Sequence, residues 1–381
     1  MSKYDDNYQL LIDAINFKNK RPLTSFSGPA VGAILSGMTI AELVADPVKG
    51  TYKTIDFIHE IDDECGGINL VNSIPTGLNM VVQISMLWYS KVLIPGIDIG
   101  ENTVWQVQEK KLIDSDQYDE IIKEGFGNFA KKNIIPNIID IDYMNKYLKI
   151  FAESQETIFN KYKDMGYPIT QDFRCPTTMI PFEWLSGMRS MSELLLDCYT
   201  QLDKVKEVCD AIFEEKYAET EAGLEKVKTN RDVVGAWTGG WRTASAMVSP
   251  KIWDTLVWPY MKKSAEQVIH AGKISVLHLD QNWNRDIERF GELEEGKYIL
   301  NTDGMTDLRA ARKKLPKTCF MGDVPATLLT AGTPEQVYDY VTRLIDDIGP
   351  EGLIVTAGCD IPESATRENI VAMFKAANEW S

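Results

Sequence analysis

Three residues in the C-terminal part of the chain carry side chains of the kinds that bind zinc in proteins. His278 and Asp280 stand two residues apart in an apolar run, so on a predicted strand their side chains point to the same face. Cys359 follows a second apolar run. A histidine, a cysteine and a carboxylate with one coordination position left open form the ligand set of a catalytic zinc site, whereas structural zinc sites use four protein ligands.

The spacing alone leaves a second interpretation of each residue. A single histidine in an apolar run also occurs as a hydrogen-bonded core residue. A cysteine after a buried strand also occurs as a small apolar side chain, and an aspartate at a strand end also caps helices. The chain has only three histidines, His59, His270 and His278, which limits the places where imidazole chemistry is available. Asp280 is a candidate both for the third metal ligand and for a catalytic acid.

Four more residues lie where substrate contacts are expected. Trp241 and Arg242 follow the strand predicted over 233–237, Asp323 ends the strand predicted over 318–323, and Glu183 ends a Pro-Phe-Glu segment. We predict that all four bind substrate, and that Arg242 binds a carboxylate through two parallel hydrogen bonds. The alternatives are a salt bridge for Arg242, a helix cap for Asp323 and anchoring of its own loop for Glu183.

These residues need a scaffold that brings strand ends together, and short apolar runs that alternate with longer amphipathic segments predict one. Strands are expected over 233–237, 274–280, 298–301, 318–323 and 353–358. Helices are expected over 8–16, 39–45, 52–61, 191–217, 250–271, 306–313, 334–348 and 365–377. The pattern predicts an α/β protein, a (β/α)8 TIM barrel over residues 76–381, with a helical extension over residues 1–75 that packs on it. Reactive groups of such barrels lie where strands end and loops begin, as the residues above do.

Composition narrows the class of protein. The 381 residues are 44% hydrophobic and 25% charged, which is typical of a soluble globular protein. The net charge of −16 disfavours nucleic acid and anionic membranes as partners, and no apolar run approaches a membrane span, which takes about 20 residues. The first residues, MSKYDDNYQL, lack the basic and apolar regions of a secretory signal. The six cysteines show no CxxC spacing, so we expect reduced thiols and a cytoplasmic protein.

The chain resembles the uroporphyrinogen decarboxylase superfamily, and within it the corrinoid-dependent methyltransferases. The resemblance covers most of the chain and is clearest at 181–183, at 256–272 leading into 275–278, at 321–325, and at 353–362 followed by 368–370. It implies a zinc ion bound by a His-x-Cys pair and a distant cysteine, and a corrinoid (cobalamin) carried by a partner protein. Here the pattern reads His278-Leu279-Asp280 with Cys359. The resemblance therefore implies His278 and Cys359 as ligands, and leaves Asp280 as a ligand, as a partner that orients a ligand, or as an acid.

Within the superfamily the decarboxylase itself fits poorly. That enzyme is recognised by an arginine-rich N-terminal motif that binds the acidic side chains of its porphyrin, and residues 20–45 here contain a single arginine, Arg21. Two classes of methyltransferase remain, and they differ in the direction in which the methyl group is transferred. One type moves a methyl group from methylcobalamin to a thiol such as coenzyme M, and the other moves it from a donor to Co(I) of a corrinoid protein. The alternative outside the enzymes is a barrel that binds a small aromatic molecule or a corrinoid without catalysis.

Two observations favour transfer from a donor to the corrinoid. A carboxylate at Asp280 keeps the charge of a thiolate but donates less electron density, which leaves zinc a stronger Lewis acid, suited to an ether oxygen. Several of six tryptophans lie next to predicted strand ends, where they would provide flat apolar walls for a methoxylated ring, and the alternative for about half of them is packing in the core or in caps: Trp88, Trp105, Trp184, Trp237, Trp241 and Trp283. We therefore predict O-demethylation of a methoxylated aromatic compound, with simple methylated donors as the alternative. A homodimer is compatible with the sequence.

Overall fold

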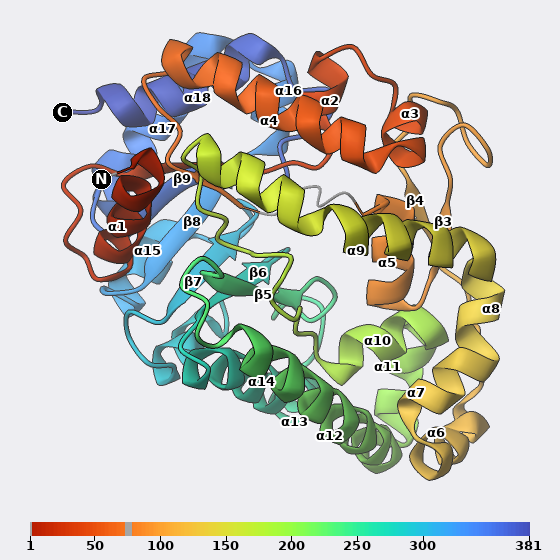
Figure 1. Ribbon diagram of the computed structural model, residues 1–381. Helices are drawn as coiled ribbons and strands as arrows, with labels where there is room; N and C mark the ends of the chain where they lie inside the picture. Colours follow the sequence, from red (N-terminus) through yellow and green to blue (C-terminus); the bar gives the residue numbers. More distant parts are fainter. Residues whose placement is uncertain (1, 73–77) are drawn as a thin grey trace.

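A parallel sheet forms the centre of the computed structural model, which describes residues 2–72 and 78–381 (Figure 1). Its seven strands lie in the order β2-β1-β9-β8-β7-β6-β5. Their bounds are β1 Leu23–Phe26, β2 Leu70–Val71, β5 Gly235–Gly240, β6 Ile274–Leu279, β7 Tyr298–Thr302, β8 Cys319–Val324 and β9 Leu353–Ala357. The strands expected over 274–280, 298–301, 318–323 and 353–358 are confirmed within one residue at each end. The strand expected over 233–237 lies further along, at 235–240.

A segment at 168–178, which contains a turn at 172–175, connects the two edges of this sheet. At one edge Ile169 forms a parallel bridge with Val71 of β2, and at the other edge Thr178 forms a parallel bridge with Thr238 of β5. The seven strands and this segment therefore surround one axis in the order in which they occur along the chain. This is the arrangement of a TIM barrel, so the expected fold class is confirmed.

The first 72 residues contribute two strands of the sheet as well as helices. The helices are α1 Lys3–Ile15, α2 Val31–Leu35, α3 Ile40–Ala45 and α4 Pro47–Glu64. The helices expected over 8–16, 39–45 and 52–61 correspond to α1, α3 and α4. The expected division of the chain between residues 75 and 76 lies outside the described residues.

A mainly helical region lies beside the barrel, at the right of Figure 1. Its helices are α5 Met80–Trp88, α6 Tyr118–Glu124, α7 Phe126–Phe129, α8 Ile135–Ile138 and α9 Ile141–Asp164, and its strands β3 Lys91–Leu93 and β4 Gln106–Gln108 are antiparallel. The long helix α9 packs along α4, where the Lys161 ammonium donates to the Asp56 carboxylate at 2.6 Å.

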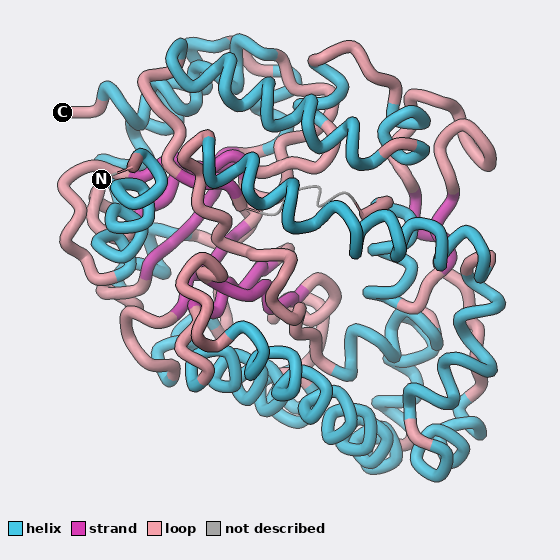
Figure 2. Tube along the Cα trace, in the orientation of Figure 1, coloured by secondary structure: helices cyan, strands magenta, loops and turns pink. Residues whose placement is uncertain are grey.

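Helices surround the strands on the outside (Figure 2). Those after residue 180 are α10 Pro181–Arg189, α11 Met191–Thr200, α12 Leu202–Val227, α13 Pro250–Leu256, α14 Trp258–His270, α15 Leu308–Lys314, α16 Ala326–Ala331, α17 Pro334–Ile348 and α18 Arg367–Glu379. No helix in residues 2–72 and 78–381 is both long and apolar enough to cross a membrane.

Two expected helices are each interrupted once, while α15, α17 and α18 match the helices expected over 306–313, 334–348 and 365–377. The helix expected over 191–217 is divided into α11 and α12 at Gln201, whose φ of −149° and ψ of 48° lie outside the helical region. The helix expected over 250–271 is divided into α13 and α14 just before Pro259. The break lies at Val257, with a φ of −114° and a ψ of −69°, and Pro259 has no amide hydrogen to donate to the carbonyl four residues earlier.

Apolar side chains fill the end of the barrel interior where the strands begin. Ile274 and Val276 of β6 and Ile299 of β7 belong to this cluster, and Leu11 and Ile15 of α1 pack against them. Helix α1 therefore covers the N-terminal end of the barrel. Its first residue follows Ser2, whose hydroxyl accepts from the Asp5 amide as an N-cap.

Replacement of Leu11 by alanine should destabilise the protein by about 2–5 kcal/mol, because the side chain is fully buried and its loss leaves a cavity. Urea unfolding followed by circular dichroism measures this change. The neighbouring Leu10 is 39% exposed, so Leu10→Ala is a matched control with an expected loss of about 0.5 kcal/mol or less. Equal losses for the two variants would contradict the role of α1 as a packed end cap.

Candidate metal centre

His278, Asp280 and Cys359 come together at the C-terminal end of the barrel. His278 lies near the end of β6, Asp280 directly after it, and Cys359 two residues beyond β9. The Nε2 atom of His278 is 3.5 Å from Sγ of Cys359 and 3.3 Å from Oδ1 of Asp280, and the three candidate ligand atoms all lie within 4.8 Å of one another. His278 is 7% exposed and the other two are partly exposed, so the group is reachable from outside.

A glycine allows the loop after β9 to reach this group. A Cβ atom at Gly358 would lie 2.5 Å from the backbone carbonyl of Asp303, which follows β7. Only a residue without a side chain permits this approach. The neighbouring Cys359 is thereby brought to His278 although β7 and β8 separate β6 from β9 in the sheet.

Asn301 contacts the other nitrogen of the imidazole, and sequence reasoning did not find it. It lies in β7 directly opposite His278 in the parallel register, and its Oδ1 is 2.7 Å from Nδ1 of His278. The available signal was its position two residues after the inward-facing Ile299, which puts a polar side chain on the inner face of a buried strand.

Acidic groups dominate the electrostatics of this end of the barrel. Burial acts to lower the pKa of His278, but the adjacent Asp280 and Cys359 hold that pKa well above its ordinary value. Burial raises the pKa values of the Cys359 thiol and of the Asp303 and Asp360 carboxyls. This donor set consists of an imidazole nitrogen, a thiol and a carboxylate, and further acidic groups lie near it. By donor type and by charge it fits a divalent transition metal such as zinc.

A row of tryptophans extends from the histidine. The ring of Trp237 is 6.1 Å from that of His278, Trp241 is 5.1 Å from Trp237, and Trp88 of α5 is 3.8 Å from Trp241 between ring centroids. The Trp237 ring lies across Gly239, where a Cβ atom would approach it to 1.7 Å. Trp237, Trp241 and Trp88 are partly exposed, so this row forms an apolar wall beside the candidate ligands.

The structure places Trp241, Arg242 and Glu183 together beside this wall. Glu183 is fully buried and accepts hydrogen bonds from the Arg242 amide at 2.8 Å and the Thr243 hydroxyl at 2.9 Å. The Arg242 guanidinium lies over the Trp88 ring, donates to a backbone carbonyl of α10 and lies 3.7 Å from a carboxylate oxygen of Glu109. Glu183 thus joins α10 to the loop after β5, and the substrate contacts expected of these residues stay predictions.

Asp323 is not brought to the group around His278. Its carboxylate accepts a hydrogen bond at 3.0 Å from the Tyr340 hydroxyl, which belongs to α17. Asp360, which follows Cys359, accepts from the Ser27 hydroxyl at 2.9 Å. The substrate contact expected of Asp323 stays a prediction, and its described partner is a helix of the outer layer.

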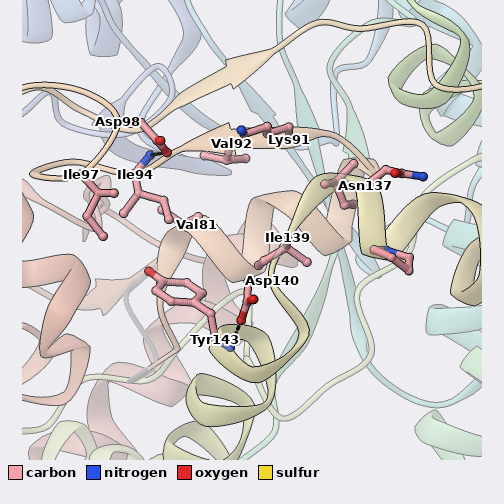
Figure 3. Close-up of a pocket in the computed structure, with 12 residues that line it drawn as sticks. Val81, Lys91, Val92, Ile94, Ile97, Asp98, Asn137, Ile139, Asp140 and Tyr143 are labelled. Carbon is pink, nitrogen blue, oxygen red and sulfur yellow. Dashed lines mark hydrogen bonds between the residues drawn. The ribbon is translucent and has the colours of Figure 1, made fainter.

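A cavity of about 430 Å³ lies outside the barrel (Figure 3). It is lined by residues of α5, β3, α8 and α9 and their connecting loops, among them Val81, Val92, Ile139 and Tyr143. None of its lining residues belongs to the group around His278. Its position outside the barrel separates it from the candidate metal centre.

The fold and the site together define a class of protein, a parallel α/β barrel with candidate metal ligands at its C-terminal end. Residues 177–380, more than half of the chain, match the model of the uroporphyrinogen decarboxylase (URO-D) family, and the chain belongs to this family. A solved structure of a methyltransferase from Methanosarcina mazei shares the fold, with a TM-score of 0.68 over 98% of each chain and 14% sequence identity. A comparison with curated protein sequences finds no match.

The buried carboxyl of Glu183 should make the free energy of unfolding depend on pH. Burial raises its pKa from 4.5 to about 7, so between these values the native state keeps a proton that the unfolded chain has lost. Stability therefore falls as pH rises through this window. Glu183→Gln removes this contribution. The free energy of unfolding of this variant, minus that of the natural chain, should therefore increase by about 2–3 kcal/mol from pH 5 to pH 8.

Urea unfolding at several pH values measures this difference. Glu221→Gln is the matched control, because Glu221 is exposed on α12, and its difference from the natural chain should stay constant over the same range. A constant difference for Glu183→Gln as well would show that the buried carboxyl does not change its proton affinity on folding.

Proposed function

We propose that the protein is a zinc-dependent methyltransferase that moves a methyl group from a methoxylated aromatic compound to Co(I) of a corrinoid carried by a partner protein. The observation that carries this proposal is the convergence of His278, Asp280 and Cys359 beside a partly exposed aromatic wall. The fold shared with a methanogen methyltransferase supports the reaction class.

His278, Asp280 and Cys359 would hold the zinc ion, with a coordination position open to substrate. Bound zinc would supply Lewis acidity to the ether oxygen of the donor while the bond from that oxygen to the methyl carbon breaks. A carboxylate ligand at Asp280 supports an ether donor, because a carboxylate donates less electron density to a metal than a thiolate does. In this proposal the methyl group passes to cobalt, and the aromatic oxygen leaves as a phenolate that takes a proton from water.

The side chains beside the candidate ligands would bind the rest of the donor. Trp237 and Trp241 would pack against its ring, since flat apolar surfaces favour aromatic partners. The guanidinium of Arg242 lies over Trp88, the third tryptophan of this row, and would bind a carboxylate on the ring. Glu183 would act on this end indirectly, because it holds the backbone of Arg242 in place.

Metal analysis tests the candidate ligands. The purified protein should contain one tightly bound zinc per chain, and Cys359→Ala should lower zinc affinity at least about tenfold, because it removes one of three protein ligands. Cys175→Ala is the matched control, since Cys175 is buried in a separate cluster. Methyltransferase activity in a preparation free of zinc would contradict this part of the proposal.

A spectral assay tests the direction of transfer. When the protein is mixed with a Co(I) corrinoid protein and a methoxybenzoate, the cobalt spectrum should shift towards methyl-Co(III), and Trp241→Ala should slow the shift at least about tenfold through loss of ring contacts. Leu196→Ala, on the exposed part of α11, is the control. Methylation of a thiol from methylcobalamin, with no shift for any methoxyaromatic donor, would select the thiol methyltransferase instead. Absence of both reactions would favour a barrel that only binds ligands.

A further inference from the structure

We infer that Asn301 is a positioning residue of the metal centre, which sets the orientation and the tautomer of His278. The inference rests on the proposed metal site and adds a residue to it that is not a ligand. Asn301 is fully buried in β7, and its side chain touches the imidazole on the side away from Asp280 and Cys359.

The amide of Asn301 can have only one orientation. Its Nδ2 is 3.2 Å from the backbone carbonyl of Met321, and because a carbonyl only accepts hydrogen bonds, the NH2 group must face it. The Oδ1 atom therefore faces His278 at 2.7 Å. An oxygen at this position only accepts, so Nδ1 of His278 carries the hydrogen. In the neutral imidazole, which is the form that binds a metal, Nε2 is then the nitrogen with the lone pair, and it faces Asp280 and Cys359.

Side chains from the opposite side of the barrel hold this amide in place. The Asn72 amide group, directly after β2, donates to Oδ1 of Asn301 at 3.3 Å, and the Thr170 hydroxyl donates to Oδ1 of Asn72 at 2.9 Å. All three residues are at most 1% exposed. The chain of hydrogen bonds thus crosses the interior, from the segment at 168–178 through β2 and β7 to His278 on β6. Buried amides with such partners have little freedom to rotate.

The interior changes from apolar to polar at the layer where these residues lie. Ile299 and Val276 face the apolar cluster, and two residues further along the same strands come Asn301 and His278. An asparagine here costs free energy unless its polar atoms are paired. The amide oxygen of Asn301 accepts hydrogen bonds from two groups and its nitrogen donates to one, so most of its hydrogen-bonding capacity is used.

A neutral acceptor suits this position because acids already surround the imidazole. Metal-binding histidines usually donate their second N–H to a carboxylate, a carbonyl or water. Asp280, Asp303 and Asp360 already interact electrostatically with His278. An amide oxygen gives the same directional contact without a further negative charge.

Zinc affinity of the purified full-length chain tests the inference. Asn301→Leu keeps the approximate size but removes the acceptor, and should lower zinc affinity about 10- to 100-fold, as measured by competition with a chromophoric chelator. Asn301→Asp keeps the acceptor, so it should bind zinc more tightly than Asn301→Leu, but less tightly than the natural chain because it adds a negative charge and loses the donor that faces the Met321 carbonyl. Asn369→Leu is the matched control, because Asn369 is also a buried asparagine that donates to backbone carbonyls, but on α18. It should leave zinc affinity unchanged.

A spectroscopic measurement separates positioning from a general effect on folding. The chain has only three histidines, so ¹⁵N-histidine labelling should resolve the Nδ1–H signal of His278 in the zinc-bound protein. The signal should lie far downfield in the natural chain and in Asn301→Asp, and should move upfield in Asn301→Leu as the hydrogen bond is lost. Unchanged zinc affinity and an unchanged signal in Asn301→Leu would overturn this inference but not the proposed metal site. A natural chain that binds no zinc would instead overturn the proposed metal site, and the inference with it.

Discussion

The contacts around one imidazole ring determine how the C-terminal end of this barrel is built. The His278 ring meets Asn301 at Nδ1, Asp280 and Cys359 at Nε2, and the Trp237 ring from the side. These groups come from β5, from β6, from β7 and from the loop after β9, so the parallel register of the strands sets their spacing. A shift of β7 by one residue would turn the Asn301 side chain to the other face of the sheet. The register is in turn supported by the apolar layer below, where Ile299 and its neighbours on other strands pack together.

Charge is the second constraint on this region. Asp280, Asp303, Asp360 and Cys359 lie around a single imidazole, and within the described ranges none of them pairs with a lysine or an arginine. Holding so many partly buried acids close together without a positive counter-charge is unfavourable. A divalent cation would supply that counter-charge, which links the electrostatics to the donor set that His278, Asp280 and Cys359 present.

The parts of the fold that could be predicted are those that depend on local pattern. Strands β6 to β9 are short apolar runs between amphipathic helices, and His278, Asp280 and Cys359 stand at or just beyond their ends. The segment at 168–178 could not be predicted, because it is joined to its neighbours by isolated bridges and has no regular alternation. The contact between Asn301 and His278 was also missed, since it depends on the register between strands and not on spacing along the chain. The division at Gln201 was missed because no residue there is a helix breaker.

The position of helix α1 at one end of the barrel constrains the order in which ligands bind and leave at the other end. Leu11 and Ile15 of α1 pack into the apolar cluster at the beginning of the strands, so among the described residues that end of the barrel is covered and apolar. Both the methyl donor and the corrinoid of a partner protein would then have to use the same entrance, the one beside His278. A partner docked there would cover the donor and trap it, and the demethylated product would leave only after the partner departs. Turnover under the proposed reaction would accordingly follow a compulsory order, in which an excess of the partner protein slows the exchange of small molecules.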